Sequence, residues 1–196
     1  MNVSELLTLA LLAIFAENVV LVQLLGVRPL LDTSEKPGTA AAVGLLVTVV
    51  MGLTCLCTWF FNTYLLIPFG AADFLQTLLF VLTAAAIVRI LDLILKKALP
   101  ALHALLGSQL PMTALNCAVL GAALQSAQNG SGALASTAYG VFAGLGFTVA
   151  ALLFCSVRGR LEFAECPKAF EGFPIALVSA GLLAMAFLGF SGLQLN

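Results

Sequence analysis

Six long apolar runs constrain the fold of this chain more than any other feature. Each is close to the roughly 20 residues that a helix needs to cross the hydrocarbon core of a bilayer. Polar or turn-forming segments separate the runs, and none alternates apolar and polar residues as a barrel strand would. The sequence therefore predicts an all-α polytopic membrane protein with six transmembrane helices. The runs span approximately residues 4–26, 38–62, 72–95, 101–125, 132–156 and 172–194.

The composition agrees with lipid as the surroundings of this chain. Hydrophobic residues make up 62% of it and charged residues only 9%, with a mean hydropathy of +1.13. Soluble domains carry about 25% charged residues. The net charge of −1 gives no indication of a nucleic-acid partner. Residues 1–5 lack a basic stretch, so the first run is expected to be retained rather than cleaved. We expect one integral membrane domain over residues 1–196.

The cations fall on alternate connections between the runs, which predicts an orientation. Positively charged residues accumulate on the cytoplasmic side of membrane proteins. Both termini and the second and fourth connections lack Lys and Arg, so both termini should face outward and the basic loops should be cytoplasmic. The cations are Arg28 and Lys36 after the first run, Arg89, Lys96 and Lys97 at the end of the third, and Arg158, Arg160 and Lys168 between the last two.

Three spans per half place the two halves in opposite orientations, as in an inverted repeat. The halves cover about residues 1–98 and 99–196. Asn18 and Asn116 lie 98 residues apart (116 − 18), which is half of the 196 residues. A small apolar stretch follows each of them, and glycine and proline lie near both. We therefore expect related sites in the first and fourth spans.

Glu17, Asn18 and Asn116 are polar residues deep inside apolar runs. Ionisable residues inside a membrane are candidates for a functional site, so we take these three as candidates for an ion pathway. Two interpretations remain open for the asparagines, because Asn also hydrogen-bonds neighbouring helices for purely structural reasons. Glu17 is either a protonatable relay group or a neutral, hydrogen-bonded carboxyl.

The cysteine count and the absent motifs exclude several classes of function. Five cysteines in an apolar chain do not suggest a disulfide framework. No nucleotide-binding glycine loop, zinc-protease motif or CxxC pair occurs. We therefore do not expect this chain to be catalytic alone. The cysteines are Cys55, Cys57, Cys117, Cys155 and Cys166.

Motifs along the whole chain resemble one family of membrane subunits, the A-type subunits of Rnf/Rsx ion-translocating electron-transport complexes. The D- and E-type subunits of the sodium-translocating NADH:quinone reductase are related to that family. The motifs are Asn18 to Gly26 with Pro29 in the first run, Asn116 to Gly121 in the fourth, Tyr139-Gly140 with Gly144 to Phe147 in the fifth, and Ile175 to Leu193 in the last.

The resemblance implies a component of a redox-driven ion pump in the bacterial cytoplasmic membrane. Such complexes couple electron transfer between ferredoxin and NAD to movement of Na⁺ or H⁺. The resemblance also implies that the first and fourth helices are broken. The implied partners are the pseudo-symmetric E-type subunit and the D- and G-type subunits. In the family, the A-type and E-type subunits share a [2Fe–2S] cluster, for which each gives two cysteines, and no flavin is implied on this chain.

This chain departs from the family at the implied cluster. Cys117 matches the ligand of the fourth span, but Arg28 stands where the first-span cysteine would be. A guanidinium is always charged and has no lone pair to offer iron. A replacement ligand, three thiolates with an exogenous ligand, and a missing cluster are all compatible with this sequence. The family also usually has Asn at the position of Glu17 and often Lys at that of Gln23.

Two alternatives to a pump component follow from the residues. The first is a stand-alone secondary transporter with an inverted repeat and a binding site at the membrane midplane. The second is a non-redox scaffold subunit of the same complex, which Arg28 favours. Companion subunits are required by the pump and scaffold hypotheses and not by the transporter.

Overall fold

All regular structure in the described part of the chain is helical. The computed structural model describes residues 3–27, 37–69, 72–98, 116–128, 132–161 and 172–190. Its helices are α1 (Val3–Leu11), the π-helical turn η1 (Leu12–Ala16), α3 (Pro37–Phe61), the π-helical turn η2 (Asn62–Leu66), α4 (Ile67–Phe69), α5 (Ala72–Ala98), α8 (Cys117–Gln128), α9 (Ala133–Leu161) and α10 (Phe173–Leu188).

Three of these helical segments are long and apolar enough to cross a membrane. They are Gly38–Leu66, Leu75–Lys97 and Ala133–Leu161, which fall on the second, third and fifth predicted runs. Two shorter apolar helices, Leu6–Ala16 and Phe173–Leu188, fall on the first and last runs. The prediction of an all-α membrane protein is thereby confirmed. Most of the fourth run lies outside the described residues, which begin again at Asn116.

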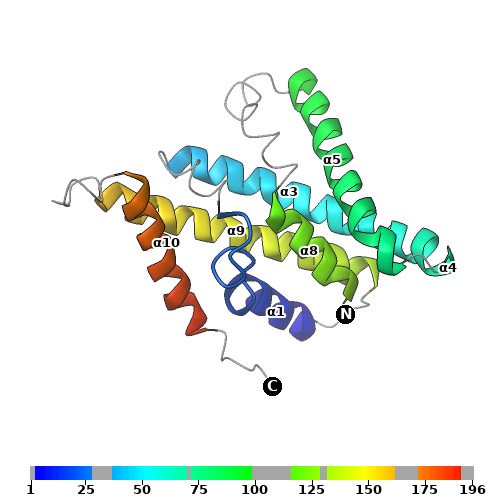
Figure 1. The fold of residues 1–196 in the computed structure, drawn as a ribbon, viewed down its shortest axis with the longest axis horizontal. Coiled ribbons are helices and arrows are strands. Elements are labelled where there is room, and N and C mark those ends of the chain that lie inside the picture. Colours follow the sequence, from blue (N-terminus) through cyan, green and yellow to red (C-terminus); the bar gives the residue numbers. More distant parts are fainter. Residues whose placement is uncertain are drawn as a thin grey trace.

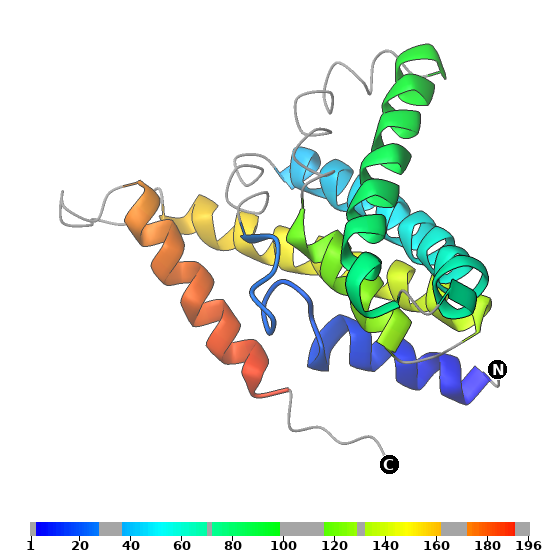
Figure 2. The ribbon, with the colours of Figure 1, turned by 45° about the vertical axis from the view of Figure 1, so that its right-hand side comes forward.

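Helices α3 and α9 form the centre of the molecule. They lie side by side and run in opposite directions (Figures 1 and 2). Small residues allow this close approach. A Cβ on Gly44 would come within 2.7 Å of the Thr148 side chain, and a Cβ on Gly144 would collide with Thr48. The two hydroxyls, of Thr48 and Thr148, lie 3.3 Å apart between the helices.

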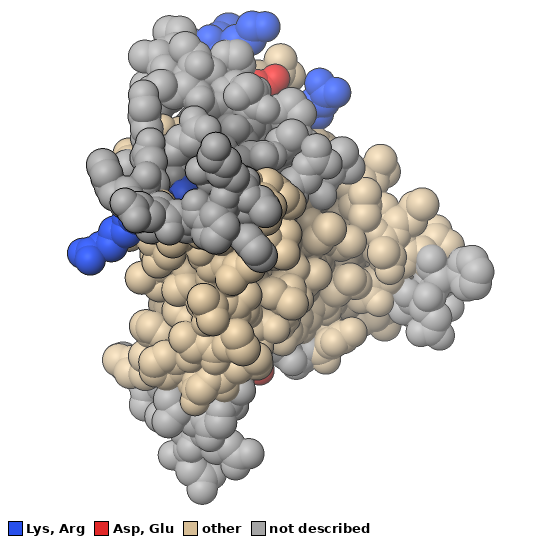
Figure 3. All heavy atoms as spheres, turned by 60° about the vertical axis from the view of Figure 1, so that its left-hand side comes forward, with Lys and Arg blue, Asp and Glu red and all other residues tan. Residues whose placement is uncertain are grey.

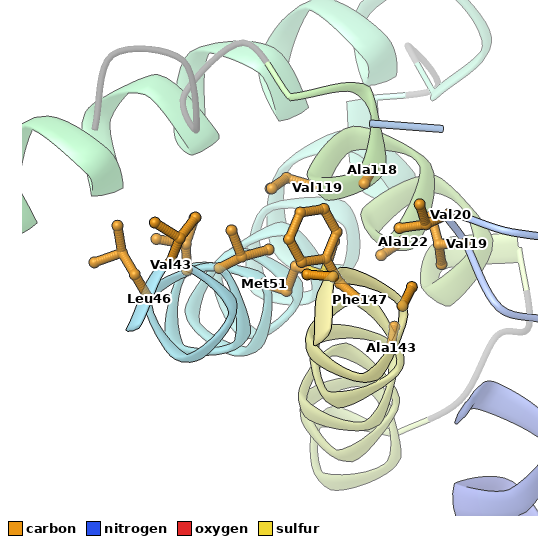
Figure 4. Close-up of a cluster of buried hydrophobic side chains, with 14 of the residues drawn as sticks. Val19, Val20, Val43, Leu46, Met51, Ala118, Val119, Ala122, Ala143 and Phe147 are labelled. Atoms are coloured by element: carbon orange, nitrogen blue, oxygen red, sulfur yellow. The ribbon is translucent and has the colours of Figure 1, made fainter. Parts of the chain in front are cut away.

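The hydrophobic core fills the space between α3, α8, α9 and the segment that follows η1 (Figure 4). Phe147 of α9 is 1% exposed and lies among these elements, so it joins residues from both halves of the sequence. A core drawn from such distant segments requires the two halves to fold together. Its labelled members are Val19, Val20, Val43, Leu46, Met51, Ala118, Val119, Ala122, Ala143 and Phe147.

The outer surface of the described residues is mostly apolar, as expected of a protein surrounded by lipid or by other membrane subunits. Within its most apolar stretch, α5 is only 22% buried, against 61% for α3. Thus α5 is a peripheral helix and α3 a central one. Figure 3 shows one face of the molecule, on which Lys and Arg gather in the upper half. The described cations are Arg89, Lys96, Lys97, Arg158 and Arg160, toward the C-terminal ends of α5 and α9.

Candidate functional site

The first apolar run stops being helical at Ala16, although its apolar character continues to Gly26. The last turn before this point is a π turn, closed by the Glu17 N–H donating to the Leu12 carbonyl oxygen at 2.7 Å. Residues 17–27 then continue mainly in turns. A π turn contains one extra residue and weakens the regular ladder of hydrogen bonds. The helix therefore ends inside the apolar run, where backbone groups need other partners.

Asn18 supplies those partners through its side chain. Its Nδ2 donates to the carbonyl oxygens of Ile14, at 2.8 Å, and of Gly146, at 3.0 Å. Its Oδ1 accepts from the backbone N–H groups of Val20, at 3.0 Å, and Leu21, at 3.2 Å. The side chain is fully buried, and both donors and both lone pairs of its amide are used. Asn18 thus fixes the non-helical segment to α9.

The contact with Gly146 shows how deep this segment lies. Gly146 is 13 residues after Ala133 (146 − 133) and 15 residues before Leu161 (161 − 146), the two ends of α9. At a rise of 1.5 Å per residue, each end of the helix is about 20 Å away. The end of the first helix therefore lies beside the middle of the longest apolar helix.

Asn116 occupies a related place at the start of α8. Its Oδ1 accepts from the N–H of Ala118 at 3.0 Å, and its backbone oxygen accepts from the N–H of Leu120 at 3.4 Å. Asn18 makes the same two kinds of bond, to the N–H groups two and four residues ahead. The two side chains differ in their donors. Asn116 is 4% exposed, and its Nδ2 has no hydrogen-bond partner within the described residues.

Gly26 brings the non-helical segment of the first half against the start of α8. Its φ is +76°, a conformation that favours glycine. A Cβ on Gly26 would lie 2.5 Å from Asn116 Oδ1 and 2.9 Å from the Ala118 Cβ. A Cβ on Gly121 would likewise collide with the Leu25 side chain. The segment around Gly26 and the N-terminus of α8 therefore meet directly.

Substitution of Gly26 by alanine is expected to destabilise the fold by more than the same change at Gly172. Gly172 also has a positive φ, of 86°, but nothing lies within 4 Å of the position of its Cβ. Gly172→Ala therefore adds backbone strain alone. Gly26→Ala adds a steric conflict with Asn116 that costs about 1–3 kcal/mol. The thermal midpoints of the two variants in detergent measure the difference, and equal midpoints would show that the contact is unimportant.

Glu17 belongs to a chain of hydrogen bonds that joins the two halves. Gln125 of α8 donates from Nε2 to Glu17 Oε2 at 3.2 Å, and Gln23 donates from its Nε2 to Gln125 Oε1 at 2.8 Å. Gln125 therefore bridges the beginning and the later part of the segment 17–27. Glu17 itself is exposed at the surface of the chain.

Among the described cysteines, Cys117 is the exposed one. It is the first residue of α8 and follows Asn116 directly. Cys55 and Cys155 are buried. Cys55 packs closely against Gly140, where an added Cβ would lie 2.8 Å from Cys55 Sγ. Within the described residues no group of three or more His, Cys, Asp and Glu could hold a metal ion. Arg28 and Cys166 lie outside the described residues.

Several residues of this region were missed by the sequence analysis. Gln125 is the last residue of the fourth predicted run, and its contact with Glu17 gives no local signal in the sequence. The pair Gly44 and Thr48 recurs 100 residues later as Gly144 and Thr148 (144 − 44 and 148 − 48), a match that could have been found in the sequence. Tyr139 belongs to the fifth-run motif, but the sequence gives no sign that its hydroxyl is buried.

Comparisons with known proteins match nearly the whole chain. The Rnf-Nqr family, described as "Rnf-Nqr subunit, membrane protein", matches residues 6–194. The A subunit of the Na(+)-translocating ferredoxin:NAD(+) oxidoreductase complex of Acetobacterium woodii is 46% identical over 184 residues, covering 94% of this chain and 95% of the relative.

Two further relatives have similar coverage. The A subunit of the ion-translocating oxidoreductase complex of Shigella flexneri is 43% identical over 92% of this chain and 93% of the relative. The protein of the same description from Azoarcus is 42% identical over 97% of this chain and 98% of the relative. The chain is therefore a member of the Rnf-Nqr family of membrane subunits.

Proposed function

We propose that this chain is the A-type membrane subunit of a redox-driven ion pump of the ferredoxin:NAD oxidoreductase type. The observation that carries this proposal is the match over 92–97% of the chain to relatives whose descriptions name the A subunits of such complexes. The protein couples electron transfer across the membrane to translocation of Na⁺ or H⁺. Three features agree with a membrane subunit of an ion pump. They are the apolar helices, the exposed apolar surface and the polar groups beside the middle of α9.

The proposed architecture is six spans arranged as two inverted three-helix repeats, with the first and fourth helices broken. The antiparallel contact of α3 and α9 supports it, because these are the second spans of the two halves. Gly44 faces Thr148 while Gly144 faces Thr48, which is the reciprocal contact that an approximate twofold axis produces. Each threonine hydroxyl also donates to the carbonyl oxygen of the glycine four residues before it, at 2.9 and 3.0 Å.

The proposed location is the bacterial cytoplasmic membrane, with both termini outside and the basic loops in the cytoplasm. The described cations support this orientation, since they lie toward the C-terminal ends of α5 and α9. The proposed partners are the other components of the complex, particularly the related E-type subunit together with the D- and G-type subunits. The weakly buried face of α5 offers apolar surface to lipid or to such a partner.

We propose that Cys117 is a ligand of an iron–sulfur cluster shared with the E-type subunit. A thiolate is the usual ligand of such clusters, and Cys117 is exposed where a neighbouring protein can approach. Among the described cysteines Cys117 alone is exposed, since Cys55 and Cys155 are buried and Cys57 is only partly exposed. Any further ligand would have to come from outside the described residues or from the partner. When bound, the cluster would carry one electron at a time; Cys117 would hold it at the start of α8.

Replacement of Cys117 by serine is expected to remove the iron signal assigned to this site in the purified complex. Serine keeps the size of the side chain but offers iron a hydroxyl in place of a thiolate. The measurement is iron content together with electron paramagnetic resonance of the reduced complex. Cys57→Ser is the matched control, because Cys57 lies within α3 and is only partly exposed. An unchanged signal and unchanged electron transfer in Cys117→Ser would favour the scaffold hypothesis.

The pump function itself is tested with the complete complex in proteoliposomes. We expect oxidation of reduced ferredoxin by NAD to drive ion accumulation, and we expect both to disappear when this protein is left out. Radioactive Na⁺ and a pH-sensitive dye report the two candidate ions separately. Ion or solute transport by this chain alone, without any companion protein, would instead support the stand-alone transporter.

A further inference from the structure

Glu17 lies next to Asn18 and therefore near the depth of the middle of α9. An ionised carboxylate surrounded by hydrocarbon is costly, so such groups are neutral, paired or placed along an ion path. Glu17 is exposed at the surface of this chain. Its described hydrogen bond comes from Gln125, an uncharged group. Neutralisation of this carboxyl in the membrane therefore calls for a cation that the described residues do not supply.

The two glutamines are suited to both protonation states of Glu17. As observed, Gln125 donates to the carboxylate and accepts from Gln23, which matches ionised Glu17. A side-chain amide has a donor at one end and an acceptor at the other. If both amides turn over, protonated Glu17 can donate to Gln125 Oε1, and Gln125 Nε2 can donate to Gln23 Oε1. The chain of three residues remains fully hydrogen-bonded in either state.

Tyr139 provides a further buried polar group, on α9. Its side chain is 6% exposed, and its hydroxyl has no hydrogen-bond partner within the described residues. Tyr139 precedes Gly146 by seven residues (146 − 139), so both lie on one face of α9, two turns apart. A buried hydroxyl without a partner is rare in a folded protein. Such a hydroxyl can both donate and accept a hydrogen bond.

We propose that Glu17 exchanges a proton during the working cycle of the complex, with Gln125 and Gln23 holding both of its states. The proton passes from a hydronium ion to a carboxylate oxygen, which leaves water and neutral Glu17, and the reverse step releases it. The cluster suits a proton better than a metal cation. A proton needs only one carboxylate oxygen of Glu17, and the hydrogen bonds of Gln125 and Gln23 can be kept in both protonation states. This inference rests on the proposed pump function and names the ion at this site.

The test uses the complete complex in proteoliposomes with Glu17→Gln, which removes the ionisable group and keeps the shape of the side chain. Proton movement per electron transferred is expected to fall by about a hundredfold, the scale of losing a positioned acid–base group. Electron transfer measured in permeabilised vesicles gives the number of electrons to which the proton movement is referred. Gln125→Leu should reduce proton movement as well. Gln128→Leu is the matched control, because Gln128 lies one turn further along α8 and is exposed.

Infrared difference spectra across a pH series provide a readout that does not depend on activity. The wild-type complex should show a protonated-carboxyl band that shifts in heavy water, changes in Gln125→Leu and is absent from Glu17→Gln. If Glu17→Gln fails to assemble, the comparison of wild type with Gln125→Leu still tests proton exchange by Glu17. A wild type without this band, or full proton movement by Glu17→Gln, overturns the inference and leaves the pump function standing. A wild type that moves no ion overturns the pump function instead.

Discussion

Replacing Asn18 by alanine is expected to destabilise this protein by about 2–5 kcal/mol, because it leaves buried backbone groups without partners. The Val20 and Leu21 N–H groups lose their acceptor, and the Gly146 oxygen loses a donor. Val20 and Leu21 are buried, so water cannot readily replace the lost partners. We expect a lower thermal midpoint in detergent and less of the protein in assembled complexes.

Asn116→Ala is the matched comparison and should cost less. Within the described residues the Asn116 side chain accepts one hydrogen bond, from Ala118, and its Nδ2 donates none. Asn18→Asp tests the acceptor and the donor of the Asn18 amide separately. It keeps the acceptor for Val20 and Leu21 but brings negative charge against the Gly146 oxygen, so it should also be destabilising. Equal losses for Asn18→Ala and Asn116→Ala would contradict the importance assigned to the contact with Gly146.

The second large effect is expected from Gly144→Ala. A Cβ at this position would collide with the backbone Cα of Thr48, so α3 and α9 would have to move apart. A conflict of this kind costs about 1–3 kcal/mol, and more where the obstacle is backbone rather than a flexible side chain. The central helix pair would lose contact along its length. We expect a lower thermal midpoint and weaker assembly with the other components of the complex.

Gly159→Ala provides the control within the same helix. Nothing lies within 4 Å of the position of its Cβ, and alanine favours a helix over glycine by about 1 kcal/mol at both sites. The difference between Gly144→Ala and Gly159→Ala therefore isolates the collision with Thr48. Gly44→Ala should lie between them, because its obstacle is the side chain of Thr148 rather than backbone. A Gly144→Ala protein as stable as Gly159→Ala would show that the helices adjust freely.

The asparagine pair illustrates how far local sequence could lead. Asn18 and Asn116 are unusual because polar side chains are rare inside apolar runs. Their spacing of half the chain predicts related positions. The structure places both at helix ends and gives them matching backbone bonds. The sequence could not show that the Nδ2 group of Asn18 has hydrogen-bond acceptors while that of Asn116 has none within the described residues. The difference depends on Gly146 lying beside Asn18, although the two residues are 128 positions apart along the chain.

Glu17 and Cys117 illustrate what depends on tertiary contacts. Glu17 is recognisable in the sequence as an acid inside an apolar run, but its hydrogen-bond partner Gln125 lies 108 residues away, at the end of the fourth predicted run. The exposure of Cys117 and the burial of Cys55 and Cys155 likewise follow from packing and not from local pattern. Arg28, which stands where the family resemblance would place a cluster cysteine, lies outside the described residues, so its consequence for iron stays a prediction.

The sequence by itself determined that this chain is an all-α membrane protein and where its apolar runs lie. Length and hydropathy suffice for that, since lipid requires each span to satisfy its own backbone. The same runs continue past Ala16 without a break in apolar character, so hydropathy could not reveal where the first helix ends. Only the tertiary structure decided that point. A helix can stop inside an apolar run only when another segment supplies its hydrogen bonds, and here Asn18 and α9 do so.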